Sequence, residues 1–358
     1  MGSRSMTSSG SGTTLVNDTL MNEDVFCNPG DLECLESSYE ELAKDDKEGI
    51  IISDLLGSWD NNIGCHEAAH VAGKILGNLK PDSALFLNTG ELDFRCDYGY
   101  IHGVFQGLAE SGRDPVKEAE SYCSEMENLV DKDECFHAAG HGSAIINKTI
   151  KPALESCAML QIIQALSCLS GVYMEHVSAY MGSKNVPNYY GPTPVDPSEA
   201  KQMCKDVQSE FLEPCARKAA FFWGWGDNNV DLMEKCTKLS NREVGSIEKT
   251  RIDRACGQGV GEWLRNKEAW PIPESKQEAD QVGGLLVNSC IKTMRGIDDV
   301  LLYSCIEGVL TVILPGQISS QMEESSWLDP CGYLKELDFK TSYNECVNLR
   351  TELISLKQ

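Results

Sequence analysis

The sixteen cysteines constrain the fold of this 358-residue chain more than any other feature of its sequence. They run from Cys27 to Cys346, and none of them are spaced as CxxC. An even number of well-separated cysteines is typical of a disulfide framework, rather than of zinc ribbons or iron–sulfur sites. The sequence therefore predicts a protein of an oxidising, extracytoplasmic compartment, whether secreted, periplasmic or at the cell surface.

Most of these cysteines belong to a repeated unit. A first cysteine is followed, about 10 to 20 residues later, by a second cysteine that opens an apolar segment. The pairs are Cys123 and Cys135, Cys157 and Cys168, Cys204 and Cys215, Cys236 and Cys256, Cys290 and Cys305, and Cys331 and Cys346. We expect each pair to form a disulfide. The segments after Cys65 and Cys96 share the template, but Cys65 could pair with either Cys34 or Cys96.

Both parts of the repeated unit predict helices. The segments after the second cysteines, such as FHAAGHGSAII, are apolar on nearly all sides and rich in alanine and glycine. The stretches between them, such as PVKEAESYCSEMENLV, are amphipathic with acidic outer faces. The sequence therefore predicts an all-α fold of disulfide-stapled helical hairpins, arranged as a solenoid or toroid with an inner layer of apolar helices.

Residues 182–198 form the clearest internal break, because four prolines and two glycines interrupt the helical periodicity there. They separate a half that contains histidine, residues 21–185, from a half without histidine, residues 186–358, although the two halves could form one continuous domain. We expect the second half to be a scaffold or a docking surface without catalytic chemistry. Residues 1–20 are interpreted as a cloning scar and flexible linker that replaces a signal peptide or membrane anchor.

The formal net charge of -24 limits the classes of partner. Nucleic acid and anionic lipid both require clustered lysine or arginine, so we expect neither as a partner. No apolar run is long enough for a membrane span. A small-molecule substrate is expected instead, and the surface of the helical repeats could dock a protein partner.

All six histidines lie in four consecutive apolar segments of the first half. They are His66, His70, His102, His137, His141 and His176. Residues four apart on a helix point in similar directions, so His66 with His70 and His137 with His141 each predict a metal clamp. Burying imidazoles on apolar helices costs free energy unless they are satisfied, and metal ligation would satisfy them.

We therefore expect all six imidazoles to line one interior region. In one arrangement, His66, His70 and His102 bind one metal ion, while His137, His141 and His176 bind a second. A single site with ligands from both sets is the other arrangement.

Residues 66–73 read HEAAHVAG, an HExxHxxG pattern that resembles zinc metallopeptidases of the zincin type. The resemblance covers about nine residues and implies that His66 and His70 bind zinc and that Glu67 is a general base. Leu76 occupies the place of the third histidine in the longer metzincin pattern. The complete set of six histidines is also similar to coupled dicopper proteins and to histidine-rich non-haem iron sites, and this similarity implies redox chemistry.

The leading interpretation of the sequence is an extracytoplasmic metal-dependent oxidoreductase that acts on a small molecule. Iron or copper is the favoured metal, and zinc is allowed. We expect Glu67 or Glu175 to transfer protons or to accept a hydrogen bond from a ligand. The alternatives are a zinc hydrolase or peptidase and a non-enzymatic repeat protein that binds metal or docks a partner.

Overall fold

The computed structural model describes residues 27, 31–58, 64–85, 87, 96, 98–126, 128–183, 195–196, 198–205, 207–226, 229–241, 246–267, 276–294, 301–309, 331–332, 335, 343–344, 346–348 and 351. Within these residues every regular element is a helix and none is a strand. The predicted all-α class is therefore confirmed. Residues 1–20, interpreted as a scar and linker, lie outside the described residues, as does most of the break at 182–198.

The first half of the chain forms a series of helices that follow the cysteine pattern. In order they are α1 (Leu32–Lys44), α2 (Glu48–Ser58), α3 (Cys65–Leu79), α4 (Pro81–Ala84), α6 (Gly99–Glu110), α7 (Pro115–Tyr122), η1 (Cys123–Glu125), α8 (Leu129–Asn147), α9 (Ile150–Cys157) and α10 (Ile162–Ser183). Local sequence explains the start of α7. Pro115 occupies its first turn, and the Asp114 carboxylate accepts a 3.1 Å hydrogen bond from the backbone N–H of Val116.

The second half continues the alternation of outer and inner helices. Its elements are η2 (Glu199–Gln202), η3 (Ser209–Phe211), α11 (Leu212–Gly226), α12 (Asn229–Ser240), α13 (Ser246–Lys267) and α14 (Lys276–Thr293). Residues 301–309 are also helical. Helices therefore continue beyond the break at 182–198, while repetition of the cysteine template across it stays a prediction.

All sixteen cysteines are paired, and each is bonded to its neighbour in the sequence. The first two bridges are Cys27–Cys34 and Cys65–Cys96. The other six are the predicted pairs from Cys123–Cys135 to Cys331–Cys346. Cys65 therefore pairs with Cys96, which settles the alternative left open by the sequence. Eight disulfides indicate an oxidising environment, since thiols in the cytosol are kept reduced.

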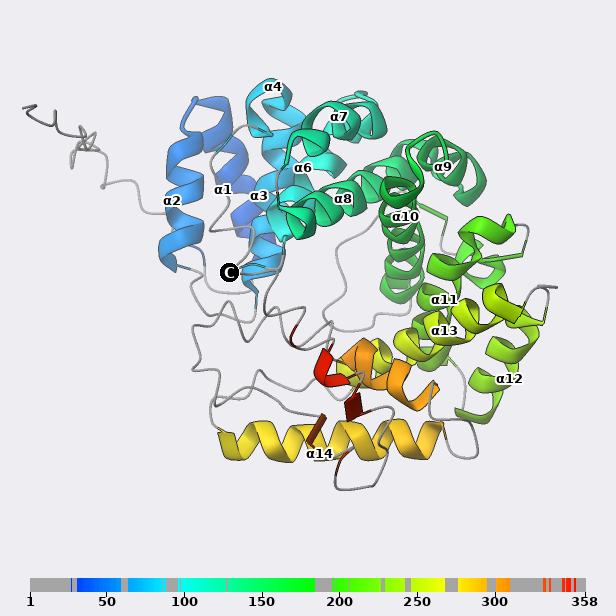
Figure 1. Cartoon of the computed structure of the whole chain (residues 1–358). Helices are drawn as coiled ribbons and strands as arrows, with labels where there is room; N and C mark the ends of the chain where they lie inside the picture. The colour runs from blue at the N-terminus through cyan, green and yellow to red at the C-terminus, as the bar shows by residue number, and fades with distance from the viewer. Residues whose placement is uncertain are drawn as a thin grey trace, which may run out of the picture.

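The inner layer consists of helices that pack on one another in chain order. Helix α3 packs against α6, α6 against α8, α8 against α10, α10 against α11, and α11 against α13. These helices follow one another around an arc in Figure 1, with α7, α9 and α12 on its outer side. This arrangement agrees with the predicted inner and outer layers. That the successive helical hairpins are copies of one repeated unit stays a prediction.

Glycines allow the inner helices to approach each other closely. A Cβ atom at Gly103 on α6 would overlap the carbonyl oxygen of His70 on α3. In the same way, a Cβ atom at Gly171 on α10 would overlap the carbonyl oxygen of His137 on α8. The histidine-bearing backbone segments therefore lie in direct contact with their neighbouring helices. This contact fixes the backbone positions from which the histidine side chains extend.

The buried apolar side chains of the described residues form two clusters that meet at α8. Phe136 and Ala139 on α8 belong to the first cluster, whereas Ala144 on the same helix belongs to the second, which continues to Cys346. The division therefore does not coincide with the break at 182–198. In the described part of the chain, no helix is long and apolar enough to cross a bilayer.

Candidate metal centre

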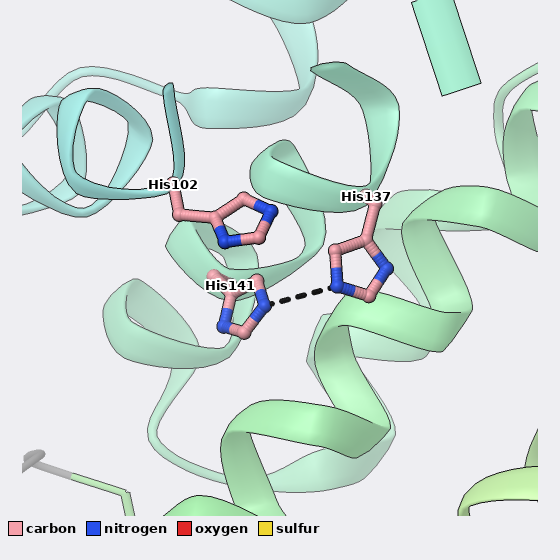
Figure 2. A group of neighbouring side chains, drawn as sticks. All are labelled: His102, His137 and His141. Carbon is pink, nitrogen blue, oxygen red and sulfur yellow. Dashed lines mark hydrogen bonds between the residues drawn. The ribbon is translucent and has the colours of Figure 1, made fainter. Parts of the chain in front are cut away.

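Three histidines from two inner helices converge where the two apolar clusters meet. His102 comes from the first turn of α6, and His137 and His141 lie one turn apart on α8. Each offers a ring nitrogen, and these atoms all lie within 4.8 Å of one another. Figure 2 shows the three rings gathered in one place, with His137 and His141 joined by a close contact. The set fits the single mixed site that the sequence left open.

The spacing of His137 and His141 suits a shared ion. Their Nε2 atoms are 3.2 Å apart. Two imidazole nitrogens on one tetrahedral ion, each bonded at about 2.0–2.1 Å, lie about 3.3–3.4 Å apart. The two rings are therefore positioned for ligation with little adjustment.

A buried carboxylate fixes the orientation of His141. Glu175 on α10 lies 2.8 Å from Nδ1 of His141 and is 3 % exposed. Because a carboxylate only accepts, Nδ1 carries the proton and donates it, which leaves the lone pair of Nε2 directed toward His137. The amide of Gln106, one turn after His102 on α6, donates to the same carboxylate oxygen over 3.2 Å. Glu175 therefore joins α6, α8 and α10 behind the site, as carboxylates behind metal-bound histidines do.

His102 has an unsatisfied nitrogen that faces this site. Its Nε2 atom is buried and makes no hydrogen bond within the described residues. A carboxylate oxygen of Glu134 lies 3.8 Å from it, which is too long for a hydrogen bond. A buried nitrogen without a partner is costly, and an ion held with His137 and His141 would remove that cost.

His66 and His70 extend the cluster along α3. The ring centroid of His66 lies 5.7 Å from that of His102 and 6.1 Å from that of His70. Nδ1 of His66 donates to the carbonyl oxygen of Cys96 over 3.1 Å, which fixes the proton on that nitrogen. Five of the six histidines therefore form one continuous group. His102 lies between its two parts, and both alternatives, two sets of three ligands or one mixed site, stay predictions.

The remaining candidates lie away from the three-histidine set. His176 follows Glu175 on α10 but is fully buried near Asp196 and Glu199, and none of the ring contacts of the described histidines includes it. Glu67 is partly exposed on α3, and no hydrogen bond or ion pair joins it to the described histidines. The roles predicted for Glu67 and His176 therefore stay predictions.

Burial lowers the pKa values of three imidazoles of the cluster. Desolvation, followed by the charges of neighbouring histidines, holds the pKa values of His70 and His102 well below the usual value for histidine. The pKa of His137 is also lowered, first by burial, then by His141, and then by Lys218 and Arg217. Metal binding requires unprotonated nitrogens, so these environments favour ligation over protonation.

Two residues of the site were missed from the sequence, although each leaves a signal there. Gln106 is a polar residue on a largely apolar helix, four positions after His102. Glu134 precedes His137 by three positions, which places both on one side of α8.

Comparisons of the chain with protein-family models, curated proteins and solved structures returned no match. The functional argument therefore rests on the site alone.

Proposed function

We propose that this protein is a secreted or cell-surface metalloprotein in which His102, His137 and His141 bind one transition-metal ion. We further propose that it is an oxidoreductase acting on a small molecule. The observation that carries the proposal is the convergence of three ring nitrogens within 4.8 Å. The carboxylate of Glu175 behind His141 and the buried, unsatisfied Nε2 of His102 support it.

The donor set favours iron or copper and also allows zinc. Three imidazole ligands suit all three metals, and they leave further coordination positions for a substrate. Iron or copper bound there would supply one-electron chemistry. Among the chain's own residues, Glu175 orients His141 through its hydrogen bond. Glu134, 3.8 Å from His102, would serve as a proton acceptor.

A zinc hydrolase is the second candidate, since a three-histidine site with an open position also suits an activated water. A zinc peptidase of the HExxH type would require Glu67 to lie close to an ion bound by His66 and His70. Those two rings are 6.1 Å apart, against 5.0 Å for His137 and His141, and the set of three includes no residue of the HExxH pattern. The HExxH peptidase form therefore has less support than a metal site at His102, His137 and His141. The non-enzymatic metal-binding alternative would require closed coordination.

Elemental analysis of protein purified without chelators tests the proposal. We expect one ion for each chain, with iron or copper supporting the oxidoreductase and zinc alone supporting a hydrolase or a structural site. His141→Phe should lose the ion, whereas His176→Phe, the same change on a neighbouring helix, should retain it. Absence of metal from the wild-type protein, even after incubation with iron, copper and zinc salts, would refute the metal centre.

A further inference from the structure

The histidine pair on α3 lies outside the three-histidine set. His66 and His70 are one turn apart near the start of that helix. In the described part of the chain, the group whose ligand atoms lie within 4.8 Å of one another includes neither of them. The proposed ion therefore accounts for three of the five clustered histidines and leaves the pair on α3 to be explained.

The separation of two imidazole rings limits whether they can hold one ion. A ligand nitrogen lies about 2.0–2.1 Å from the ion, and the centre of its ring lies about 1.1 Å farther away. Two rings on one ion therefore have centres about 5.2 Å apart at a tetrahedral angle and at most about 6.4 Å apart. The ring centroids of His66 and His70 are 6.1 Å apart, so the pair can share an ion at a wide angle.

A backbone carbonyl orients His66 in the way that is usual for a metal ligand. Nδ1 of His66 donates to the carbonyl oxygen of Cys96 over 3.1 Å. Histidines that bind metal ions commonly donate their other ring N–H to such an oxygen. Cys96 is held beside α3 by its disulfide with Cys65, the residue before His66. The hydrogen bond makes Nε2 the ligand nitrogen of this ring.

The pair on α3 also lies next to the three-histidine set. The ring centroid of His66 is 5.7 Å from that of His102. Close packing maintains this approach, because a Cβ atom at Gly99 or Gly103 on α6 would overlap the carbonyl oxygen of His66 or His70. His66 is partly exposed, whereas His70 is buried. The pair therefore extends from the surface of the protein to its interior beside the centre.

We propose that His66 and His70 bind a second transition-metal ion, adjacent to the ion at the three-histidine set. This inference rests on the proposed metal centre and adds a second ion to it. Two imidazoles hold an ion less tightly than three, and solvent completes the coordination of the second ion. The purified protein is therefore expected to retain one ion and to take up the other when metal is added.

Copper(II) binding tests the proposal. Equilibrium dialysis against buffer that contains glycine, which keeps loosely bound copper off the acidic surface, measures the number of ions bound by each variant. We expect the wild type to bind two ions and His70→Phe to bind one. His176→Phe, the matched control, should bind two. In the wild type, the electron paramagnetic resonance signal of the first copper(II) ion should broaden as the second binds, because ions on neighbouring rings interact magnetically. His141→Phe should bind the ion on α3 alone, without broadening.

The same samples separate this inference from the proposed function. A wild type with a single copper ion, kept in His70→Phe and lost in His141→Phe, would overturn the second ion and leave the metal centre intact. Two ions whose signals add without broadening would overturn their adjacent location. A wild type that takes up no copper, iron or zinc would overturn both proposals. If His70→Phe does not fold, His66→Gln replaces it at a partly exposed position, with the same expected loss of one ion.

Discussion

At the scale of single residues, the centre depends on where each imidazole carries its proton. Glu175 fixes the Nδ1 proton of His141, and the carbonyl of Cys96 fixes that of His66. The lone pair of His141 Nε2 then lies 3.2 Å from Nε2 of His137. Two lone pairs cannot face each other at that distance, so either a proton on His137 or a shared cation must lie between them.

Replacement of Glu175 tests this account of the ligand. Glu175→Gln preserves the size of the side chain but removes the negative charge that accepts from His141. We expect metal affinity to fall about 10- to 100-fold, as measured by competition with a chelator. Glu155→Gln on the exposed face of α9 is the matched control and should leave affinity unchanged. Equal affinity in both variants would show that Glu175 does not support the ligand.

At the scale of helices, contacts through glycine bring the imidazoles of different helices together. Gly103→Ala would place a methyl group against the carbonyl oxygen of His70, so α3 and α6 would have to separate. We expect a loss of about 1–3 kcal/mol in the free energy of unfolding, measured by denaturant titration, together with weaker metal binding. Gly49→Ala on α2 has no atom within 4 Å of its new Cβ and should be neutral or slightly stabilising. Equal stability of the two variants would contradict the close packing of α3 on α6.

The Cys157–Cys168 disulfide joins neighbouring helices within one short stretch of chain, so its loss should act locally. Cys157 and Cys168 are 11 positions apart and join α9 to α10. Replacing both with alanine should lower the free energy of unfolding by about 3 kcal/mol through the entropy of the unfolded chain. Metal content should stay unchanged, because Glu175 is held by the packing of α10 on α8. Loss of the ion in this variant would mean that the disulfide, rather than the packing, positions Glu175.

The sequence was sufficient for the class of fold and for the cysteine pairing, because cysteine spacing and apolar periodicity are local signals. It was not sufficient for the grouping of the histidines. Offsets from the cysteines place His102 and His176 on inner helices, but the rotation and crossing of neighbouring helices decide which rings meet. That tertiary geometry brings His102 to His137 and His141, and it places His176 near Asp196 instead.

At the scale of the whole molecule, buried imidazoles make stability depend on pH. Burial lowers the pKa of His176 to about 4, although the charges of Glu175, Glu199 and Asp196 partly oppose this shift. The pKa in the unfolded chain is about 6.5. Between these values the unfolded state binds more protons than the folded state, so stability increases with pH.

We therefore expect the free energy of unfolding of the metal-free protein to decrease as the pH falls from about 6.5 to about 4. His176 alone would account for up to about 3 kcal/mol of this decrease. His176→Phe keeps a ring of similar size and should reduce the slope, as measured by urea unfolding at several pH values in the presence of a chelator. Tyr173→Phe is the matched control on α10, since burial raises the pKa of that hydroxyl far above the range tested. An unchanged slope in His176→Phe would show that the folded protein accommodates a protonated imidazole at that position.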